Sequence, residues 1–265
     1  MSVITISRGT FSGGKMLAES LSARLGYRCI DRDMLVQRAA VRGVSAEELL
    51  GALQRPPAQA SFLNHRKYIY LALVQAALAE EILDGGAIYH GLGGHLLLKG
   101  GISVLRLRVV APMECRIGMA QERLRLSRSE TIDYIQKMDA ERRKWTQYLY
   151  GVDWENPSLY DLVINLEHIS IEKATHLVTT MIKEGIFDFS PKYESAMSDF
   201  ALASRVRAEL ATNNSTSHLE VEVESKGGAI TLKSTPFEEQ EEARRCVLAV
   251  PGVTGLTIEE LAEAA

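Results

Sequence analysis

One short segment near the start of the chain has the residue types of a phosphate-binding loop. Residues 9–15, GTFSGGK, match the spacing Gly-x-x-x-x-Gly-Lys and lie between an apolar predicted strand and a predicted helix. Glycines let backbone N–H groups turn inward around phosphate oxygens, and the lysine adds a mobile positive charge for the terminal phosphates. The residues predicted to hold these phosphates are Gly9, Ser12, Gly13, Gly14 and Lys15.

The residue after the lysine departs from this pattern. A serine or threonine hydroxyl at that position normally helps to hold Mg²⁺, but the chain has Met16, whose thioether cannot replace it. Either Mg²⁺ is held through other groups, such as Ser12, Asp33 or bound water, or its binding is weakened. The three cysteines are far apart and have no histidine at metal-ligand spacing, so we predict no metal site built from clustered side chains.

Arginines on two predicted helices further along the chain are candidates for binding the transferred group. Arg116 and Arg123 lie on one helix, and Arg142 lies on the next, three residues after Asp139. Phosphoryl transfer gathers negative charge, so its catalysis needs converging cations, and Asp139 can fix Arg142 by a charge-assisted contact on the same helix face. For any one arginine the alternative is a solvated surface position. The residues expected to act in catalysis are Lys15, Arg116, Asp139 and Arg142.

The elements that must position these residues alternate between strand and helix over about the first 185 residues. The predicted strands are 3–6, 27–30, 87–90, 104–111 and 162–166. Helices are predicted between them, with Ser127 and Ser170 as the first residues of the last two. This order predicts one α/β domain with a parallel sheet flanked by helices.

The pattern changes after Gly185. Residues 189–197 have no clear period and are predicted to be a linker between a first domain, 1–188, and a second, 198–262. The second domain reads as helix, strand, strand, helix, strand, with a tight hairpin turn at Gly227-Gly228. We expect a small α+β domain of order αββαβ, and each domain has elements enough for its own core.

Composition limits the classes of partner. The chain has 265 residues, of which 46% are hydrophobic and 24% charged, and its net charge of -4 argues against a nucleic-acid partner. The N-terminus has no basic segment followed by a long apolar run, and no stretch is long and apolar enough for a transmembrane segment. We therefore expect a cytoplasmic protein, and any phosphate that it binds should be small and held locally, as in a small-molecule nucleotide.

Residues 1–183 resemble the cytidylate kinase-like family. The matching segments are Ser7-Arg8, Ser12-Gly13-Gly14-Lys15, Leu25-Gly26-Tyr27, Asp31-Arg32-Asp33, Ala111-Pro112 with Arg116, Asp139-Ala140-Glu141-Arg142, Gly151-Val152-Asp153-Trp154 and Tyr160–Asn165. The resemblance implies a P-loop NTPase-type domain with a helical lid. It also implies phosphoryl transfer from ATP or GTP to a nucleoside monophosphate, with Mg²⁺ as cofactor.

The acceptor side departs from this family. Members that resemble true cytidylate kinases carry an arginine in a Gly-Arg turn after the third strand, where this chain has Leu92, which cannot bind phosphate. His90 and His95 lie nearby, although a lone histidine is more often a packed or surface residue than a ligand. The residues expected to bind the acceptor are Asp33, Arg123 and His90. CMP is the acceptor that the family implies, and the residues themselves do not identify the base.

Residues 198–262 resemble a BON domain in the segments Gly227–Leu232 and Val250–Val253. The resemblance implies a binding module for a lipid, a surface or a protein partner, and the alternative is an appendage that stabilises a homodimer. Two functions therefore stay open for the whole chain. The first is an ATP-dependent kinase, which Lys15, Asp139 and Arg142 favour; the second is a nucleotide sensor with little turnover, which Met16 and Leu92 favour.

Overall fold

The structure, a computed structural model, describes residues 2–41, 44–49, 63–91, 93–98, 104–185 and 191–260. The expectations for Leu92, for residues 189–190 of the predicted linker and for the last two residues of the predicted second domain lie outside the described residues. Among the described residues, no helix combines the length and the apolar composition that crossing a membrane requires.

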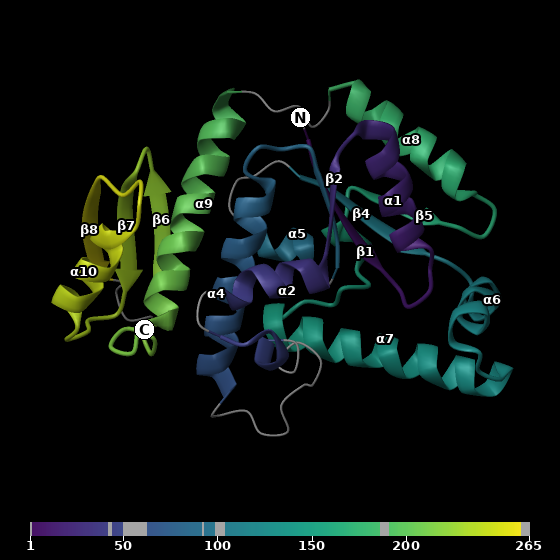
Figure 1. Cartoon of the computed structure of the whole chain (residues 1–265), viewed down its shortest axis with the longest axis horizontal. Helices are drawn as coiled ribbons and strands as arrows, with labels where there is room; N and C mark the ends of the chain where they lie inside the picture. Colours follow the sequence, from purple (N-terminus) through teal and green to yellow (C-terminus); the bar gives the residue numbers. More distant parts are fainter. Residues whose placement is uncertain are drawn as a thin grey trace.

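Five parallel strands form the central sheet of the larger part of the molecule (Figure 1). They are β1 (Val3–Arg8), β2 (Arg28–Asp31), β3 (Ala87–His90), β4 (Val104–Val110) and β5 (Leu162–Asn165). Their spatial order is β2-β3-β1-β4-β5, so β1 is central and Ile4 lies opposite both Ile88 and Leu105. The predicted parallel α/β sheet is confirmed.

Helices cover both faces of this sheet. One face packs against α1 (Gly14–Leu25) and α8 (Ile171–Lys183), which share a core cluster with Ile4, Ile6 and Leu107. The other face packs against α2 (Arg32–Ala40), α4 (Leu63–Ile82) and the short α5 (Gly94–Leu97). Helix α6 (Met113–Leu124) and the long α7 (Arg128–Tyr150) lie beside the sheet, and α7 runs along the lower side of Figure 1.

Local sequence signals set the ends of several helices. Ser127 and Glu130 form the predicted capping box of α7: the Ser127 backbone N–H donates to Glu130 Oε2 at 2.9 Å, and its hydroxyl accepts from the Glu130 backbone. Gly151 ends the same helix with a φ of 68°, a conformation that glycine adopts without strain. Ser170 caps α8 by accepting from Lys173 N. Both ends of α7 are therefore set by residues within its own sequence.

The smaller part of the molecule has the predicted αββαβ order. Its elements are α9 (Pro191–Thr212), β6 (Glu222–Lys226), β7 (Ala229–Ser234), α10 (Gln240–Ala249) and β8 (Gly255–Glu260). β6 and β7 are antiparallel, and β8 adds to β7 in parallel. The hairpin turn has positive φ at Gly227 (59°) and Gly228 (89°), which is the geometry of a tight two-residue turn.

One core cluster extends across the two parts, while each part also has a cluster of its own. Residues 191–197, predicted as linker, form the first turns of α9, because apolar side chains there are covered by the larger part. Met197 and Ala208 are each 1% exposed and belong to the cluster that contains Leu73 of α4 and Leu35 of α2. A different set of α9 residues, including Val206, packs on the small sheet.

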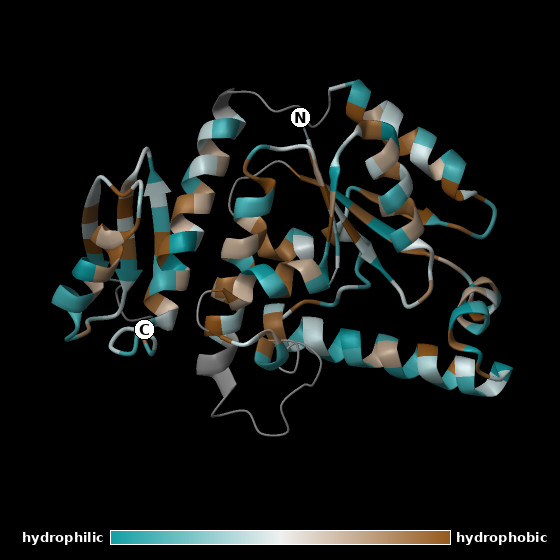
Figure 2. Cartoon of the chain, in the orientation of Figure 1, coloured by the Kyte–Doolittle hydropathy of each residue, from teal (hydrophilic) through white to brown (hydrophobic). Residues whose placement is uncertain are grey.

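We call the contact between α4 and α9 the apolar seam (Figure 2 shows hydrophobic residues in brown). Two polar contacts accompany it: the Tyr68 hydroxyl donates to Val221 O at 2.9 Å, and Arg207 Nη1 donates to Gln75 Oε1 at 2.5 Å. The amide nitrogen of the same Gln75 donates to Leu97 O of α5 at 2.6 Å. The apolar seam thus reaches the helix that follows β3.

Candidate functional site

A cavity of about 570 Å³ lies between the carboxyl ends of β1, β2 and β3 and the helix α7. Ligands of parallel α/β sheets bind at this edge, because the loops that leave the strands converge there. The strand ends contribute Arg8, Asp31 and His90, and α7 contributes Arg142 and Trp145. The cavity is therefore assembled from segments up to about 150 residues apart in sequence.

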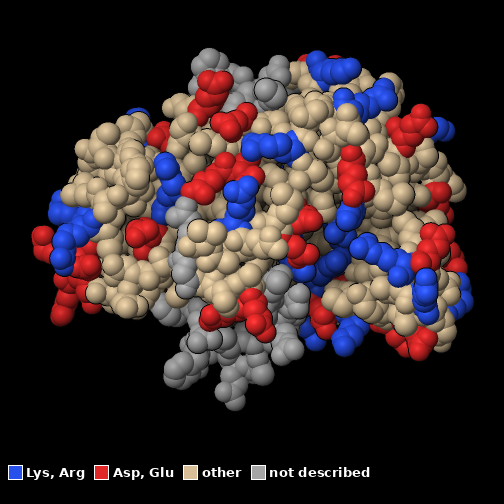
Figure 3. Space-filling view, viewed as in Figure 1, with Lys and Arg blue, Asp and Glu red and all other residues tan. Residues whose placement is uncertain are grey.

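Positive charge exceeds negative charge on the cavity wall. The cationic side chains are Arg8, Lys15, Arg32, Arg123 and Arg142, and the carboxylates are Asp31, Asp33 and Glu141. Figure 3 shows Lys and Arg side chains gathered between the sheet and α7, while both signs mix elsewhere on this face. Such a wall suits a ligand that carries several phosphate charges.

The loop after β1 turns tightly onto α1, and glycine is required there. Gly13 has a φ of 86°, and an added Cβ would lie 2.7 Å from Leu166 Cδ1. At Gly14, where α1 begins, a Cβ would lie 2.6 Å from Arg8 Cδ. The loop backbone therefore approaches its neighbours too closely for any other side chain, which is the geometry that a phosphate-binding turn needs.

Of the residues predicted to hold phosphate, Lys15 reaches the cavity and Ser12 does not. The Lys15 side chain is 46% exposed, lines the cavity and lies 3.6 Å from Glu19, an ion pair too exposed to hold it firmly. The buried Ser12 hydroxyl bonds to the carbonyls of Gly9 and Val109, each at 3.0 Å. Ser12 thus braces the loop against β4, and the prediction that it holds Mg²⁺ has no geometric support.

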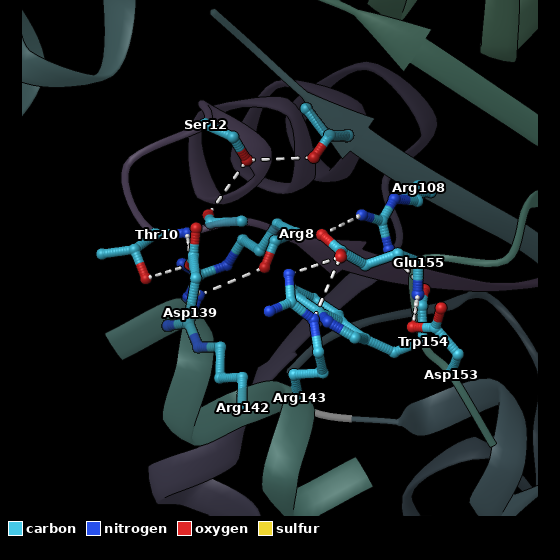
Figure 4. A network of polar contacts seen from close by, with 12 residues as sticks. Arg8, Thr10, Ser12, Arg108, Asp139, Arg142, Arg143, Asp153, Trp154 and Glu155 are labelled. Carbon is cyan, nitrogen blue, oxygen red and sulfur yellow. Dashed lines mark hydrogen bonds and ion pairs between the residues drawn. The ribbon is translucent and has the colours of Figure 1, made fainter. Parts of the chain in front are cut away.

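The first half of the loop is bonded to α6 and α7, the lid helices, by three residues that we call the polar seam: Thr10, Arg116 and Asp139. Thr10 and Asp139 are labelled in Figure 4. The Asp139 carboxylate accepts from the Thr10 backbone N–H at 2.9 Å, from its hydroxyl at 2.7 Å and from Arg116 Nη2. Arg116 Nε also donates to Thr10 O at 2.8 Å. Arg116 of α6 and Asp139 of α7 thus bind Thr10 on both sides of its peptide.

This arrangement extends one expected role and changes another. Asp139 pairs with Arg142 as expected, Oδ1 to Nη1 at 3.8 Å, and Arg142 Nη1 also donates to Arg8 O at 3.2 Å. Arg116 was expected among the catalytic cations, yet its charge is committed to Asp139 and it is not among the residues that line the cavity. Arg116 and Asp139 therefore position the loop, whereas Arg142 lines the cavity.

Burial and neighbouring charges shift the pKa values of this group. Burial alone would raise the pKa of Asp139, but the Thr10 and Arg116 hydrogen bonds outweigh it and lower that pKa below its ordinary value. Burial, followed by repulsion from Arg8, lowers the pKa of Arg142 to about 10. At neutral pH the polar seam therefore holds a carboxylate, and Arg142 stays cationic.

An apolar contact runs beside the polar seam. Phe11, whose φ of 55° is unusual for a residue with a side chain, packs against a cluster that includes Ile117 of α6 and Ile135 of α7. Its ring centroid lies 6.3 Å from that of Tyr134, which lines the cavity. Two consecutive loop residues, Thr10 and Phe11, therefore tie the phosphate loop to the lid.

The three predicted acceptor residues all lie at the cavity, whereas the neighbouring His95 does not. Asp33, Arg123 and His90 line the cavity, whereas His95 packs against the Tyr160 ring at 4.8 Å and contacts the Ser7 hydroxyl. Burial, with a smaller contribution from Arg8, lowers the pKa of His90 to about 4, so His90 is neutral at neutral pH. It can donate or accept one hydrogen bond there, but it cannot replace a missing arginine charge.

Sequence reasoning missed several cavity residues. Arg8 is the last residue of β1, and Arg32 comes directly after β2. Trp145 lies on α7, and Trp154 lies in the loop that follows this helix. The arginines could have been found, because charged residues at the carboxyl ends of parallel strands share one edge of the sheet. The two tryptophans could not have been found, since their position at the cavity depends on how α7 and the loop after it lie beside that edge.

The residues present fit a magnesium-bound nucleotide in part. Met16 is 51% exposed and offers no hydroxyl, but the Asp31 and Asp33 carboxylates face the cavity and can accept hydrogen bonds from metal-bound water. One Asp31 oxygen caps α2 by accepting from Met34 N at 2.8 Å. Among the described residues, no cluster of three or more His, Cys, Asp or Glu is arranged as a metal site.

Comparisons with known proteins point to one family. The model of the "Cytidylate kinase-like family" matches residues 3–168. A "Cytidylate kinase" of Staphylothermus marinus is 31% identical over 194 residues, which cover 69% of this chain and 98% of that protein, and one of Thermococcus kodakarensis is 26% identical over 167 residues, 63% and 80%. An uncharacterized protein from Eubacterium ventriosum shares the fold, with a TM-score of 0.54 at 14% identity over 69% of this chain and 99% of that one.

Proposed function

Because the chain belongs to the cytidylate kinase-like family, we propose that it is a kinase that transfers a phosphoryl group from ATP to a small phosphorylated acceptor of the CMP type. Kinase activity on a nucleotide or another small molecule is what the family supports, and the nucleoside monophosphate acceptor is the finer part of the proposal. ATP as donor and Mg²⁺ as cofactor belong to the same proposal.

The observation that carries this proposal is the convergence of cations on one cavity. Lys15 comes from the phosphate loop, Arg8 and Arg32 from two strand ends, and Arg123 and Arg142 from the lid helices. Binding of a nucleotide needs mainly the loop, whereas transfer needs positive charge around the group that moves between two phosphates. Five cations from five segments fit the second requirement.

Each part of the site has a role in transfer. Lys15 holds the terminal phosphates of the donor, Arg142 stabilises the charge that develops on the transferred group, and Arg32 and Arg123 hold the acceptor phosphate. Helix α7 with Trp145 excludes water, which would otherwise accept the phosphoryl group. When bound, Mg²⁺ supplies charge neutralisation between donor phosphates, and Asp31 and Asp33 would hold it through its water ligands.

A second candidate function is a nucleotide sensor with little turnover. Met16 favours it, because a weakened hold on Mg²⁺ slows transfer more than binding. The continuity between the cavity side and α9 through the apolar seam favours it as well. In this function, residues 198–262 act as a BON-type module that recognises a lipid or protein partner, or holds a homodimer.

The first experiment tests catalysis through Arg142. We expect Arg142→Ala to lower kcat by ~10²-fold, because it removes one preorganised donor from the transferred group, while the affinity for ATP changes little. Arg142→Lys should recover only part of the rate, since an ammonium cannot replace the planar fork. ADP release with CMP as acceptor is the measurement, and Lys137→Ala, an exposed residue on the same helix, is the control.

Equal rates for the Arg142→Ala variant and the wild type would show that Arg142 does not act in catalysis. A wild type with no turnover on a panel of nucleoside monophosphates would reject the kinase and favour the sensor.

The second experiment tests the phosphate loop through Lys15. The chain has two tryptophans, Trp145 and Trp154, and both line the cavity, so their fluorescence reports on bound nucleotide. We expect Lys15→Ala to weaken ATP binding by about 10-fold or more, because a charge-assisted bond to phosphate is lost. The melting temperature should stay within about 2 °C, because the side chain is half exposed. An unchanged ATP affinity would exclude the loop as the phosphate site.

A further inference from the structure

Arg108 is a buried arginine on β4 that the proposed reaction does not use. Its side chain is 10% exposed, and its guanidinium carbon lies 4.7 Å from the centre of the Trp154 ring and 5.7 Å from that of Tyr160. Nη1 donates to the backbone carbonyl of Trp154, and Nη2 lies 3.4 Å from Glu155 Oε1. One strand side chain thus contacts three residues of the loop that connects α7 to β5.

The carbonyl of Trp154 is the centre of these contacts. Besides Arg108, the Tyr160 hydroxyl donates to it at 2.7 Å, so both of its lone pairs are used. Next to it, Asp153 Oδ1 accepts from the Glu155 backbone N–H at 2.9 Å, which closes a turn. The backbone around Trp154 is therefore held from two sides in one position.

Glu155 connects this position to the lid. Its Oε2 accepts from Arg143 Nε at 3.1 Å and Nη2 at 2.5 Å, while its Oε1 faces Arg108 (Figure 4). Arg143 follows Arg142 on α7, and Arg108 lies on the sheet. A single carboxylate therefore joins the sheet to the lid helix at the residue next to the expected catalytic arginine.

The result of these contacts is the position of the Trp154 side chain. It is 4% exposed and lines the cavity, and the Arg108 guanidinium lies over its ring in a cation–π contact. Burying a guanidinium is unfavourable unless its donors are bonded, so Arg108 and the loop hold each other. If Arg108 were only a structural brace, its loss would leave ligand affinity unchanged.

We propose that Arg108 is a positioning residue that clamps the 151–160 loop, so that Trp154 forms a fixed wall of the cavity against which the phosphorylated ligand is held. The identity of the ligand in this inference rests on the proposed function. The contacts by which Arg108 holds the loop do not depend on it. Arg108 acts through the Trp154 carbonyl and ring, and it does not touch the reacting phosphates.

The first measurement follows the exposure of Trp154 to water by its fluorescence. In a Trp145→Phe background, Trp154 is the only tryptophan, and its emission reports its contact with water. We expect Arg108→Met to move this emission to longer wavelength and to increase quenching by acrylamide several-fold, because the carbonyl bond and the stacked cation are both lost. Arg108→Lys should give a smaller change, since one ammonium cannot bond the carbonyl and stack at once.

Arg106 provides the matched control. It lies two residues earlier on β4 and pairs with Asp161, Nη2 to Oδ1, at 2.6 Å, but it does not line the cavity. Arg106→Met should leave Trp154 emission unchanged. If Arg108→Met fails to fold, Tyr160→Phe tests the same clamp, because it removes one of the two bonds to the Trp154 carbonyl and keeps the ring.

Ligand affinity is the second measurement, made with CMP and with ATP on variants that retain Trp145. We expect Arg108→Met to raise KM for at least one of them by ~10-fold, the equivalent of one lost charge-assisted bond, with kcat changed less. Unchanged Trp154 emission and unchanged KM in Arg108→Met would overturn the clamp. A wild type without turnover would overturn the proposed kinase alone, because the emission shift needs no substrate.

Discussion

Two seams join segments that are distant in sequence. One consists of hydrogen bonds between polar groups, and the other consists of buried apolar side chains. The polar seam joins the phosphate loop to the lid through Thr10, Arg116 and Asp139, with hydrogen bonds at 2.7–2.9 Å. The apolar seam joins α4 to α9 through buried side chains such as Met197 and Ala208.

This difference suggests that the polar seam can open, whereas the apolar seam stays closed. Directional polar bonds are exchanged for bonds to water at a net cost of about 1 kcal/mol each, so a lid held by them can open and close again. Apolar surface has no such replacement partner in water, and its separation costs free energy in proportion to area. We therefore expect the lid to move during a reaction cycle and α9 to stay on α4.

The largest effect should come from removing the apolar seam. A chain ended at residue 188 loses α9 and exposes the α4 face that Met197 and Ala208 cover. We expect its free energy of unfolding to fall by about 4 kcal/mol, which is roughly 10 °C in melting temperature. Thermal unfolding followed by circular dichroism is the measurement, with a chain ended at Glu260 as control.

The opposite outcome has a clear meaning. If residues 1–188 melt at the temperature of the longer chain and bind ATP equally, then α9 is an accessory helix, and the core of the larger part is stable without it.

A smaller effect should come from the polar seam. Asp139→Asn removes the charge that Arg116 and Thr10 bond, and we expect it to lower the free energy of unfolding by about 2 kcal/mol at pH 7. The pKa of Asp139 is lowered in the folded protein, so the carboxylate stabilises the fold above its unfolded pKa of about 4. This contribution is lost as the pH falls through the lower folded pKa.

Urea unfolding between pH 7 and pH 3 measures the difference between wild type and variant. We expect the difference to be constant above about pH 5 and to shrink below about pH 4. Asp133→Asn, an exposed substitution on the same helix, should show no such difference. A difference for Asp139→Asn that is independent of pH would mean that the charge is not what stabilises the seam.

The smallest effect should come from the polar bond within the apolar seam. Arg207→Met keeps an apolar stem but removes the bond to Gln75, and we expect it to cost about 1 kcal/mol, or roughly 3 °C. The exposed Arg244→Met is the control, measured by the same melting curves. A loss as large as that of the truncated chain would show that polar bonds, not apolar area, hold α9 in place.

Secondary structure followed from local patterns almost everywhere. The five strands, the capping box at Ser127 and the Gly227-Gly228 turn were predictable, because each depends on residues within a few positions. Residues 191–197 were not, since their sequence has no helical period of its own. They are helical because Met197 is buried against α4, a contact across more than 100 residues.

The candidate site was predictable in its residue types more than in their roles. Lys15, Arg123, Arg142, Asp33 and His90 reach the cavity, as their chemistry suggested. For Ser12, Arg116 and Asp139 the spacing pointed to phosphate or metal chemistry, yet their polar atoms bond the loop itself. Sequence spacing on one helix favours the neighbour three residues away, and it carries no information about a loop 129 residues earlier.

The sequence by itself determined the phosphate loop, the order of strands and helices and the positive charge available to a ligand, because these depend on residue type and near neighbours. The tertiary structure alone decided which charges face the cavity, that Trp154 forms part of its wall, and that α9 completes a core it does not belong to in sequence. The physical reason is that a buried polar atom must find a partner and a buried apolar face must be covered, wherever in the chain that partner lies.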